Sequence, residues 1–258
     1  MAKATSPAEG LARLPVVALV TAYNEAATIG PVIDALLACP DVDRVHVVDD
    51  ASTDDTRAVA RRRGVEVTTL PTRVPVGRAI MSHLDVVTDE ALLFWCDADL
   101  VGLEPDYVSA LIARRRAGDV GQAFGSRGVP LNWPGPLRAF ARPLWTYAFA
   151  PISGERVVLR SDFVKAIRLA NELGWSETMR GYGVVLFLNW WVGKFANGST
   201  ALYFDKLRQR QKYQKWGRRA ALLMVRQWLQ FAWVWLKIRL NAGRIERLAA
   251  REPAAAAA

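Results

Sequence analysis

The stretch Ala91-Leu-Leu-Phe-Trp-Cys-Asp-Ala-Asp99 is an apolar run that stops at two acids. A buried strand that ends in this way delivers two carboxylates to the edge of a sheet. Carboxylate oxygens suit Mg²⁺ or Mn²⁺, and Mg²⁺ commonly takes one or two carboxylates together with substrate phosphates. The pattern Asp-X-Asp also occurs as an ordinary helix cap, so its setting in the chain decides between the two.

Strand and helix patterns alternate around this stretch. Predicted strands cover residues 16–21, 44–48, 65–70 and 91–96, and predicted helices cover 27–38, 55–63, 77–87 and 105–117. Ser52 or Thr53 is expected to cap the second of these helices, and Gly64 to close it. Such alternation predicts an α/β fold with a Rossmann-like, mostly parallel central sheet and helices on both faces.

Polar clusters follow three of the predicted strands. They are Tyr23-Asn24-Glu25, Asp49-Asp50 and Asp97-Ala98-Asp99. In open α/β sheets, ligands bind outside the carboxyl ends of the strands. We therefore expect the three clusters to converge on one crevice, the alternative being three unrelated solvated loops.

The positive charge is concentrated near the C-terminus. The chain has 258 residues and a net charge of +9. Residues 206–247 hold twelve Lys or Arg and one acid, a net +11, so the remaining residues sum to −2. This distribution indicates a local binding surface rather than a globally cationic protein.

Other composition features exclude several classes. Cys39 and Cys96 both lie in apolar surroundings and are expected to be core thiols in a reducing cytosol. The sequence has no Gly-x-Gly-x-x-Gly, Walker, His-Glu-x-x-His or Gly-x-Ser-x-Gly pattern, which leaves dehydrogenases, NTPases, zinc proteases and serine hydrolases without support.

The sequence also suggests where the protein acts. Residues 1–14 lack the apolar stretch of about 7–15 residues found in signal peptides, and no uncharged run approaches the roughly 20 residues that span a bilayer. We expect a cytoplasmic protein, peripheral on the inner face of the cell membrane. The expected segments are a flexible 1–14, a nucleotide-sugar-binding half at 15–125, an acceptor-binding half at 126–204, a basic Trp-rich helical segment at 205–250 and a disordered tail at 251–258.

The segment 220–240 is predicted to be an amphipathic helix. Its polar positions form a narrow stripe, and apolar residues cover the rest; the stripe consists of Arg219, Arg226, Gln230 and Lys237. An apolar, Trp-rich helix flanked by bases favours an anionic membrane surface, contacted through residues 206–240. The alternatives are packing on the catalytic domain or on a second subunit in a homodimer. RNA binding is a remote alternative, and no nucleic-acid partner is expected.

The motifs together resemble family 2 of the glycosyltransferases, an inverting group with the GT-A fold. The matching segments are residues 16–25, 47–56 and 97–99, and Gly77-Arg78-Ala79 stands where the family often has a Gly-Lys-Gly-like element. Ser153-Gly-Glu-Arg156 and Gly181-Tyr-Gly-Val184 resemble the branch that contains polyprenyl-phosphate glycosyltransferases and glucosyl-3-phosphoglycerate synthases.

The resemblance implies a nucleotide-sugar donor, UDP- or GDP-linked, with Mg²⁺ or Mn²⁺ on its diphosphate. It implies that Asp99 holds the metal and that Asp97 faces the ribose or the metal, and these two are also the expected catalytic acids. The other implied donor-binding residues are Thr21, Tyr23 and Glu25 around base and ribose, Asp49 or Asp50 on the base, Arg78, and Ala98.

The acceptor side is defined less well. Many relatives in this branch have a carboxylate directly after Gly-Tyr-Gly-Val, where this chain has Val185. A histidine near the metal is also common, but His46 and His83 fall inside a predicted strand and helix and are expected to be structural. Glu155 and Glu177 are the remaining candidates for a general base.

A missing base favours a phosphate acceptor, because phosphate is already an anion. Arg156, as a catalytic residue, and Arg160 are expected to bind that phosphate, beside the acceptor-site residues Ser153 and Gly154; the alternative is a surface salt bridge to Asp162 or Glu155. The main prediction is an inverting transfer to a polyprenyl-phosphate-like lipid at the membrane. The alternative is a soluble enzyme acting on a small phosphorylated acceptor such as 3-phosphoglycerate, or on a sugar hydroxyl.

Overall fold

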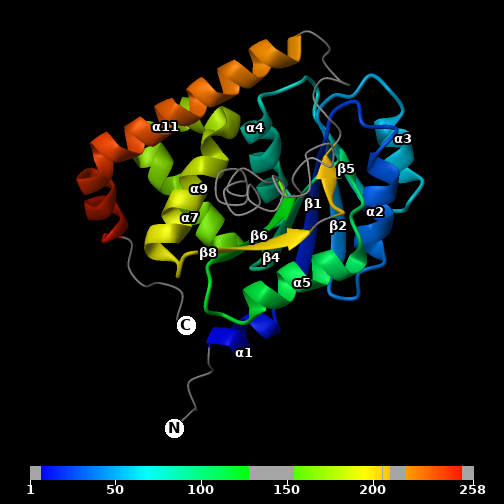
Figure 1. Cartoon of the computed structure of the whole chain (residues 1–258), viewed down its shortest axis with the longest axis horizontal. Coiled ribbons are helices and arrows are strands. Elements are labelled where there is room, and N and C mark those ends of the chain that lie inside the picture. The colour runs from blue at the N-terminus through cyan, green and yellow to red at the C-terminus, as the bar shows by residue number, and fades with distance from the viewer. Residues whose placement is uncertain (1–6, 128–153, 205, 210–218, 252–258) are drawn as a thin grey trace, which may run out of the picture.

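The chain folds around a seven-stranded mixed sheet with strand order β3-β2-β1-β4-β7-β6-β8, in a computed structural model that describes residues 7–127, 154–204, 206–209 and 219–251 (Figure 1). The first four strands in space are β3 (Glu66–Thr69), β2 (Arg44–Asp49), β1 (Val16–Ala22) and β4 (Leu92–Asp97), and all are parallel. This confirms the predicted α/β fold with a mostly parallel sheet.

In the second half of the sheet, only β7 runs opposite to the other strands. Strand β7 (Arg156–Leu159) is antiparallel to β4 and to β6 (Gln122–Arg127), and β8 (Ser199–Phe204) is parallel to β6. A separate two-stranded sheet joins β5 (Leu100–Val101) to β9 (Arg208–Gln209). The sequence patterns did not predict these short strands, because their pairing partners lie far away along the chain.

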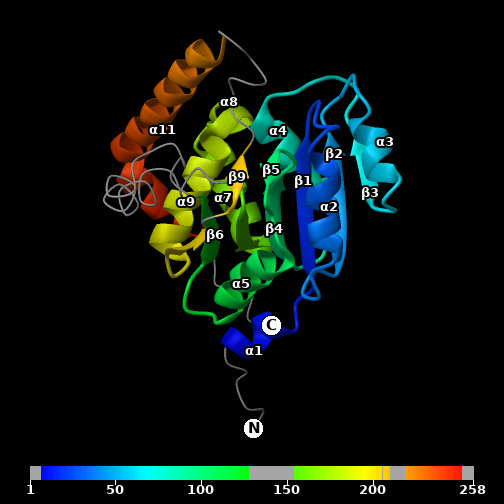
Figure 2. The ribbon, with the colours of Figure 1, turned by 45° about the vertical axis from the view of Figure 1, so that its right-hand side comes forward.

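Helices cover both faces of the sheet (Figure 2). One apolar cluster packs α2 (Ile29–Leu37) and α5 (Pro105–Arg116) against alternate residues of β1, β2 and β4. The other packs α7 (Arg160–Glu172) and α9 (Val184–Phe195) against the intervening residues of β1 and β4. Both faces of β1 and β4 are therefore buried, which explains their uninterrupted apolar sequences.

Several predicted boundaries need correction. Residues 7–12 form helix α1 (Pro7–Ala12), and Leu11 and Leu14 pack on the core, so the expectation of a flexible N-terminus is wrong for these residues. The predicted helix 55–63 is the shorter α3 (Thr56–Arg61), with no cap bond from Ser52 or Thr53. The predicted helix 77–87 is α4 (Val76–Met81) followed by the 3₁₀ turn η1 (Ser82–Asp85).

The C-terminal helix α11 (Arg219–Ala249) is longer than predicted and runs across the outside of the α7–α9 layer (Figures 1 and 2). Two members of its expected polar stripe, Gln230 and Lys237, turn toward the domain, whereas Arg226 is exposed. Lys237 Nζ donates to Thr178 Oγ1 at 2.8 Å, and the Gln230 side chain lies against Gly181. None of the described helices is long and apolar enough to cross a membrane.

Candidate functional site

The carboxyl ends of β1, β2 and β4 bring the predicted donor-site residues to one edge of the sheet. In the strand register, Thr21 of β1 pairs with Asp97 of β4, and Ala22 of β1 pairs with Asp49 of β2. Neighbouring strands lie about 4.8 Å apart. The strand register therefore brings the three loops to one edge of the sheet, as expected.

The side chains at this edge nevertheless divide between the two faces. Asp97 shares its face with Trp95, whereas Asp49 shares its face with Val45 and Val47, which belong to the opposite apolar cluster. Successive side chains of a strand alternate in this way. Asp49 and Asp97 therefore point toward opposite faces of the sheet, and no group of three or more metal-ligating side chains occurs among the residues that the structure describes.

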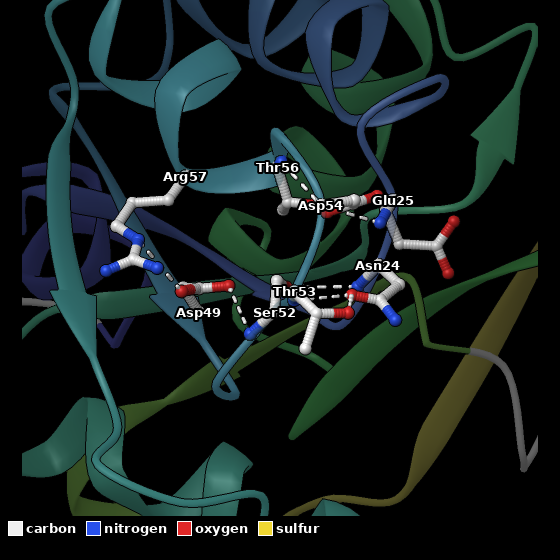
Figure 3. A network of polar contacts seen from close by, with 8 residues as sticks. All are labelled: Asn24, Glu25, Asp49, Ser52, Thr53, Asp54, Thr56 and Arg57. Carbon is white, nitrogen blue, oxygen red and sulfur yellow. Dashed lines mark hydrogen bonds and ion pairs between the residues drawn. The ribbon is translucent and has the colours of Figure 1, made fainter.

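Asp49 instead orders the loop that follows β2 (Figure 3). Its carboxylate is fully buried, accepts a hydrogen bond from Ser52 N at 3.2 Å and lies 3.6 Å from Arg57 Nε. Asn24 fixes the facing loop, because its N–H donates to Ser52 Oγ at 3.0 Å and its Oδ1 accepts from Thr53 N at 2.9 Å. Asn24 has a positive φ of 53°, a conformation that asparagine tolerates better than most residues.

The same two loops are joined again at Glu25 (Figure 3). Glu25 N donates to Thr56 Oγ1 at 2.7 Å, and Asp54 accepts from Ala26 N at 3.1 Å and from Thr56 N at 3.0 Å. Burial raises the pKa of Asp54, but the hydrogen bonds from Thr56 and Ala26 outweigh it and lower the pKa. Sequence reasoning missed Asp54 and Thr56 as supports of the site. Their position in the matching segment 47–56 was the available signal.

Tyr23 and Asp50 meet the loop before α4. The guanidinium carbon of Arg73 lies 3.9 Å from the centre of the Tyr23 ring, and Asp50 Oδ1 accepts from Val74 N at 2.8 Å. Burial raises the pKa of Asp50, while the Val74 hydrogen bond and nearby Arg73 act in the opposite direction. Arg73, which the sequence patterns did not single out, thus adds a positive charge beside the expected base pocket.

Thr21 connects this edge to a buried histidine pair. His83 Nε2 lies 3.2 Å from Thr21 Oγ1, His83 Nδ1 lies 2.9 Å from His46 Nδ1, and His46 Nε2 lies 2.9 Å from Thr68 Oγ1. Burial lowers the pKa of both histidines, and that of His83 lies well below its usual value. The two rings join β1, β2, β3 and η1, the structural role expected for them.

Asp97 is packed tightly against Gly154. A Cβ atom added to Gly154 would lie 2.2–2.5 Å from the three carboxylate atoms of Asp97, so a larger residue there would force the carboxylate to shift. Ala98 and Asp99 are buried directly after it, between β4 and β5. Two carboxylates at a strand end fit the oxygen ligand set of Mg²⁺ or Mn²⁺.

Arg78 is exposed near the start of α4, which packs closely on the 179–183 segment. A Cβ on Gly77 would lie 2.2 Å from Met179 O and 2.3 Å from Gly181 O. Gly77 therefore packs closely on the backbone of residues 179–181. This contact joins two motifs that are far apart in the sequence, Gly77-Arg78-Ala79 and Gly181-Tyr-Gly-Val184.

Arg156 is fully buried, which rules out the surface salt bridge considered as the alternative. It pairs with Trp95 across β7 and β4, its Nη1 donates to Asn189 Oδ1 at 2.6 Å, and its guanidinium lies 5.8 Å from the Trp95 ring. Asp162, the partner proposed for it, instead lies 3.8 Å from Arg115. Arg156 thus links β7 to α9, and binding of acceptor phosphate by this residue stays a prediction.

The other predicted acceptor residues separate in space. Arg160 lies at the amino end of β4, where its Nε donates to Val87 O at 2.5 Å, so it does not join the carboxyl-end group. Glu177 forms an exposed ion pair with Arg180, and Val185 is a core residue of α9. Glu155 is fully buried, and Ser153 lies outside the described residues.

Comparison with known protein families shows to which family this chain belongs. The model of glycosyl transferase family 2 matches residues 17–153, more than half of the chain. The chain belongs to glycosyl transferase family 2. The four parallel strands β1 to β4, the strand-end carboxylates and the two loops joined in Figure 3 lie in or directly border the matched region.

Individual family 2 proteins are also similar. Glucosyl-3-phosphoglycerate synthase of Mycolicibacterium paratuberculosis is 30% identical over 168 residues, which is 54% of this chain and 51% of that protein, so the chain matches about half of its curated relative. Crystal structures of the Mycobacterium tuberculosis enzyme of the same name match 90% of this chain and 86% of theirs at 21% identity. The complex with phosphoglyceric acid has a TM-score of 0.63, and that with Mn²⁺, UDP-glucose and phosphoglyceric acid has 0.61. At this identity they confirm the fold.

Proposed function

We propose that this chain transfers a sugar from a nucleotide sugar, with UDP-glucose as the first donor to test, to a small phosphorylated acceptor of the 3-phosphoglycerate type. The placement of Asp97 beside Thr21, with Asp99 buried next to it, is the observation that supports a donor site here. The similarity to glucosyl-3-phosphoglycerate synthases supports this acceptor class over the lipid acceptor that the sequence favoured.

In the proposed transfer, an acceptor oxygen forms a bond to the anomeric carbon while the bond from that carbon to the diphosphate breaks, with inversion. Held by Asp99 with Asp97 beside it, Mg²⁺ or Mn²⁺ would neutralise the charge that develops on the leaving diphosphate. Tyr23, with Arg73 against its ring, borders the space for the base.

A hydroxyl acceptor must also lose its proton to a base. Of the two candidates from the sequence, Glu177 is exposed on the surface, and Glu155 is buried next to the glycine that contacts Asp97. We propose Glu155 as the first base to test, because Glu177 is exposed and ion-paired.

The test is a transfer assay with UDP-glucose, GDP-glucose and GDP-mannose, each with 3-phosphoglycerate and Mn²⁺, read by mass spectrometry of the product. A hexosyl adduct of 3-phosphoglycerate with at least one donor is expected. Donor consumption without this adduct would reject the acceptor class. A failure to bind any nucleotide sugar in calorimetry would reject the donor site itself.

A second candidate acceptor is a polyprenyl-phosphate-like lipid, with the enzyme peripheral on the inner face of the membrane. Exposed apolar residues along α11 favour it, and an anionic phosphate oxygen would need no base. The same assay with a short-chain polyprenyl phosphate in detergent separates the candidates, because each predicts a product of different mass.

A further inference from the structure

Helix α11 has apolar residues on two opposite sides. On the inner side, Phe231, Val234, Ile238 and Ile245 are buried against the catalytic domain. Contacts with α9, α7 and the 179–183 segment lie on that side. The inner residues therefore explain how α11 is held to the domain, and they leave the opposite side unexplained.

The opposite side is a continuous apolar strip, here named the outer stripe: Leu222, Val225, Leu229, Trp233, Leu236 and Leu240. All six side chains are 40–75% exposed. At about 100° per residue they fall within roughly 80° of the helix circumference and extend over about 27 Å of its length. Six large apolar side chains in one exposed row exceed the single exposed residues that are normal on a protein surface.

Positive charge borders the outer stripe on both flanks. Arg226 and Arg244 lie along one flank, Arg239 lies along the other, and all three are exposed. The only acid in α11 is Glu246, and its carboxylate lies 3.1 Å from Lys194 Nζ. The outer stripe thus combines apolar side chains, a tryptophan and flanking arginines without an opposing acid of its own.

We propose that the outer stripe binds the interfacial region of an anionic lipid membrane, with α11 lying parallel to the membrane plane. Apolar residues would enter the headgroup–acyl boundary by about 5–10 Å while the arginines contact anionic headgroups. A second copy of the chain fits the outer stripe less well. Whether two α11 helices pair in parallel or antiparallel about a two-fold axis, their arginine-bearing flanks meet, and like charges repel. This surface is distinct from the donor edge and does not depend on which acceptor is used.

The test is vesicle flotation of the full chain with phosphatidylcholine alone and with phosphatidylcholine plus phosphatidylglycerol. The wild type should float with the anionic vesicles and release at high salt. The triple variant Leu229→Ser, Trp233→Ser, Leu236→Ser should stay unbound with an unchanged Tm, since these side chains are exposed. Arg226→Gln, Arg239→Gln and Arg244→Gln should each weaken binding about fivefold, from about 1 kcal/mol per basic residue.

The matched control is Leu37→Ser on α2, an apolar residue 52% exposed outside the outer stripe, which should float like the wild type. Wild-type protein that does not float, or a triple variant that still floats, would overturn the proposal. So would light scattering that finds a wild-type dimer and a monomeric triple variant, since the outer stripe would then serve a second copy. Sugar transfer to a water-soluble acceptor should be unchanged in all variants, which keeps this test independent of the proposed function.

Discussion

Two regions of this protein differ in how well the sequence predicts where a side chain lies. They are the proposed donor edge, at the carboxyl ends of β1, β2 and β4, and the proposed acceptor half, residues 126–204. At the donor edge, Asp49 and Asp97 each end a parallel strand, and the register alone brings them to one place. In the acceptor half, Arg156 and Arg160 are four residues apart but lie near opposite ends of β4. Local sequence specifies where a strand of a parallel sheet ends. The partners of a long side chain in the part of the sheet that contains antiparallel strands instead come from distant segments of the chain.

The largest expected effect tests the donor edge. Asp99→Asn keeps the size of the side chain but removes its charge, so sugar transfer should fall about 10³-fold through lost metal binding. Steady-state kinetics measures this, with Tm as a check on folding. A variant that keeps wild-type turnover would show that this edge does not hold the donor diphosphate.

The next effect tests the contact between the two halves. Gly154→Ala places a Cβ within 2.2–2.5 Å of the Asp97 carboxylate. The carboxylate must move, and transfer should fall about 100-fold, because small misplacements at a reacting centre are costly. Gly193→Ala on α9 is the control, since nothing lies within 4 Å of its added Cβ. Equal activities for both variants would mean that the position of Asp97 is unimportant.

Gly77→Ala tests whether α4 depends on the acceptor half for its position. The added Cβ would overlap Met179 O and Gly181 O, and backbone atoms cannot move aside cheaply. The free energy of unfolding should fall by about 2 kcal/mol or more, measured by urea denaturation. An unchanged midpoint would show that α4 and the 179–183 segment are not tightly coupled.

A smaller effect concerns the pH dependence of stability, through Asp162 in the first turn of α7. Burial raises the pKa of Asp162 to about 6, outweighing the opposite effects of Arg115 and Lys165. The folded protein then binds more protons than the unfolded chain, so this residue lowers stability as pH rises from about 4 to about 6. In Asp162→Asn that part of the pH dependence should vanish. Urea titrations at several pH values measure it, and identical slopes for both proteins would contradict the prediction.

The smallest effect is expected at Glu177, on the acceptor side. Glu177 forms an exposed ion pair with Arg180, and its side chain is 82% exposed. Glu177→Ala should leave transfer unchanged and alter stability by no more than about 1 kcal/mol. Glu155→Gln is the partner experiment, expected to lower the rate with little change in donor affinity. A rate loss in the Glu177 variant instead would return the general base to the surface segment.

Sequence patterns were sufficient for the parallel half of the sheet and for the loops at its carboxyl end. Apolar runs such as residues 16–21 and 91–96 have two buried faces, so their period and length define them locally. The pairing of Asn24 with Ser52 and Thr53 was not predictable, because each bond joins loops nearly thirty residues apart. Strands β6 and β8 escaped prediction because Gln122–Arg127 and Ser199–Phe204 mix polar residues with apolar ones instead of forming an apolar run, and β7 because it has only four residues.

Local sequence specifies which residues end the parallel strands, and thus that Thr21, Asp49 and Asp97 share one edge. The packed fold was needed to show that Asp49 and Asp97 face opposite ways, that Arg156 is buried against Trp95 and Asn189, and that α11 turns one apolar side outward. The difference arises because strand ends follow from the local period of apolar residues. The environment of a side chain instead depends on which distant elements pack around it.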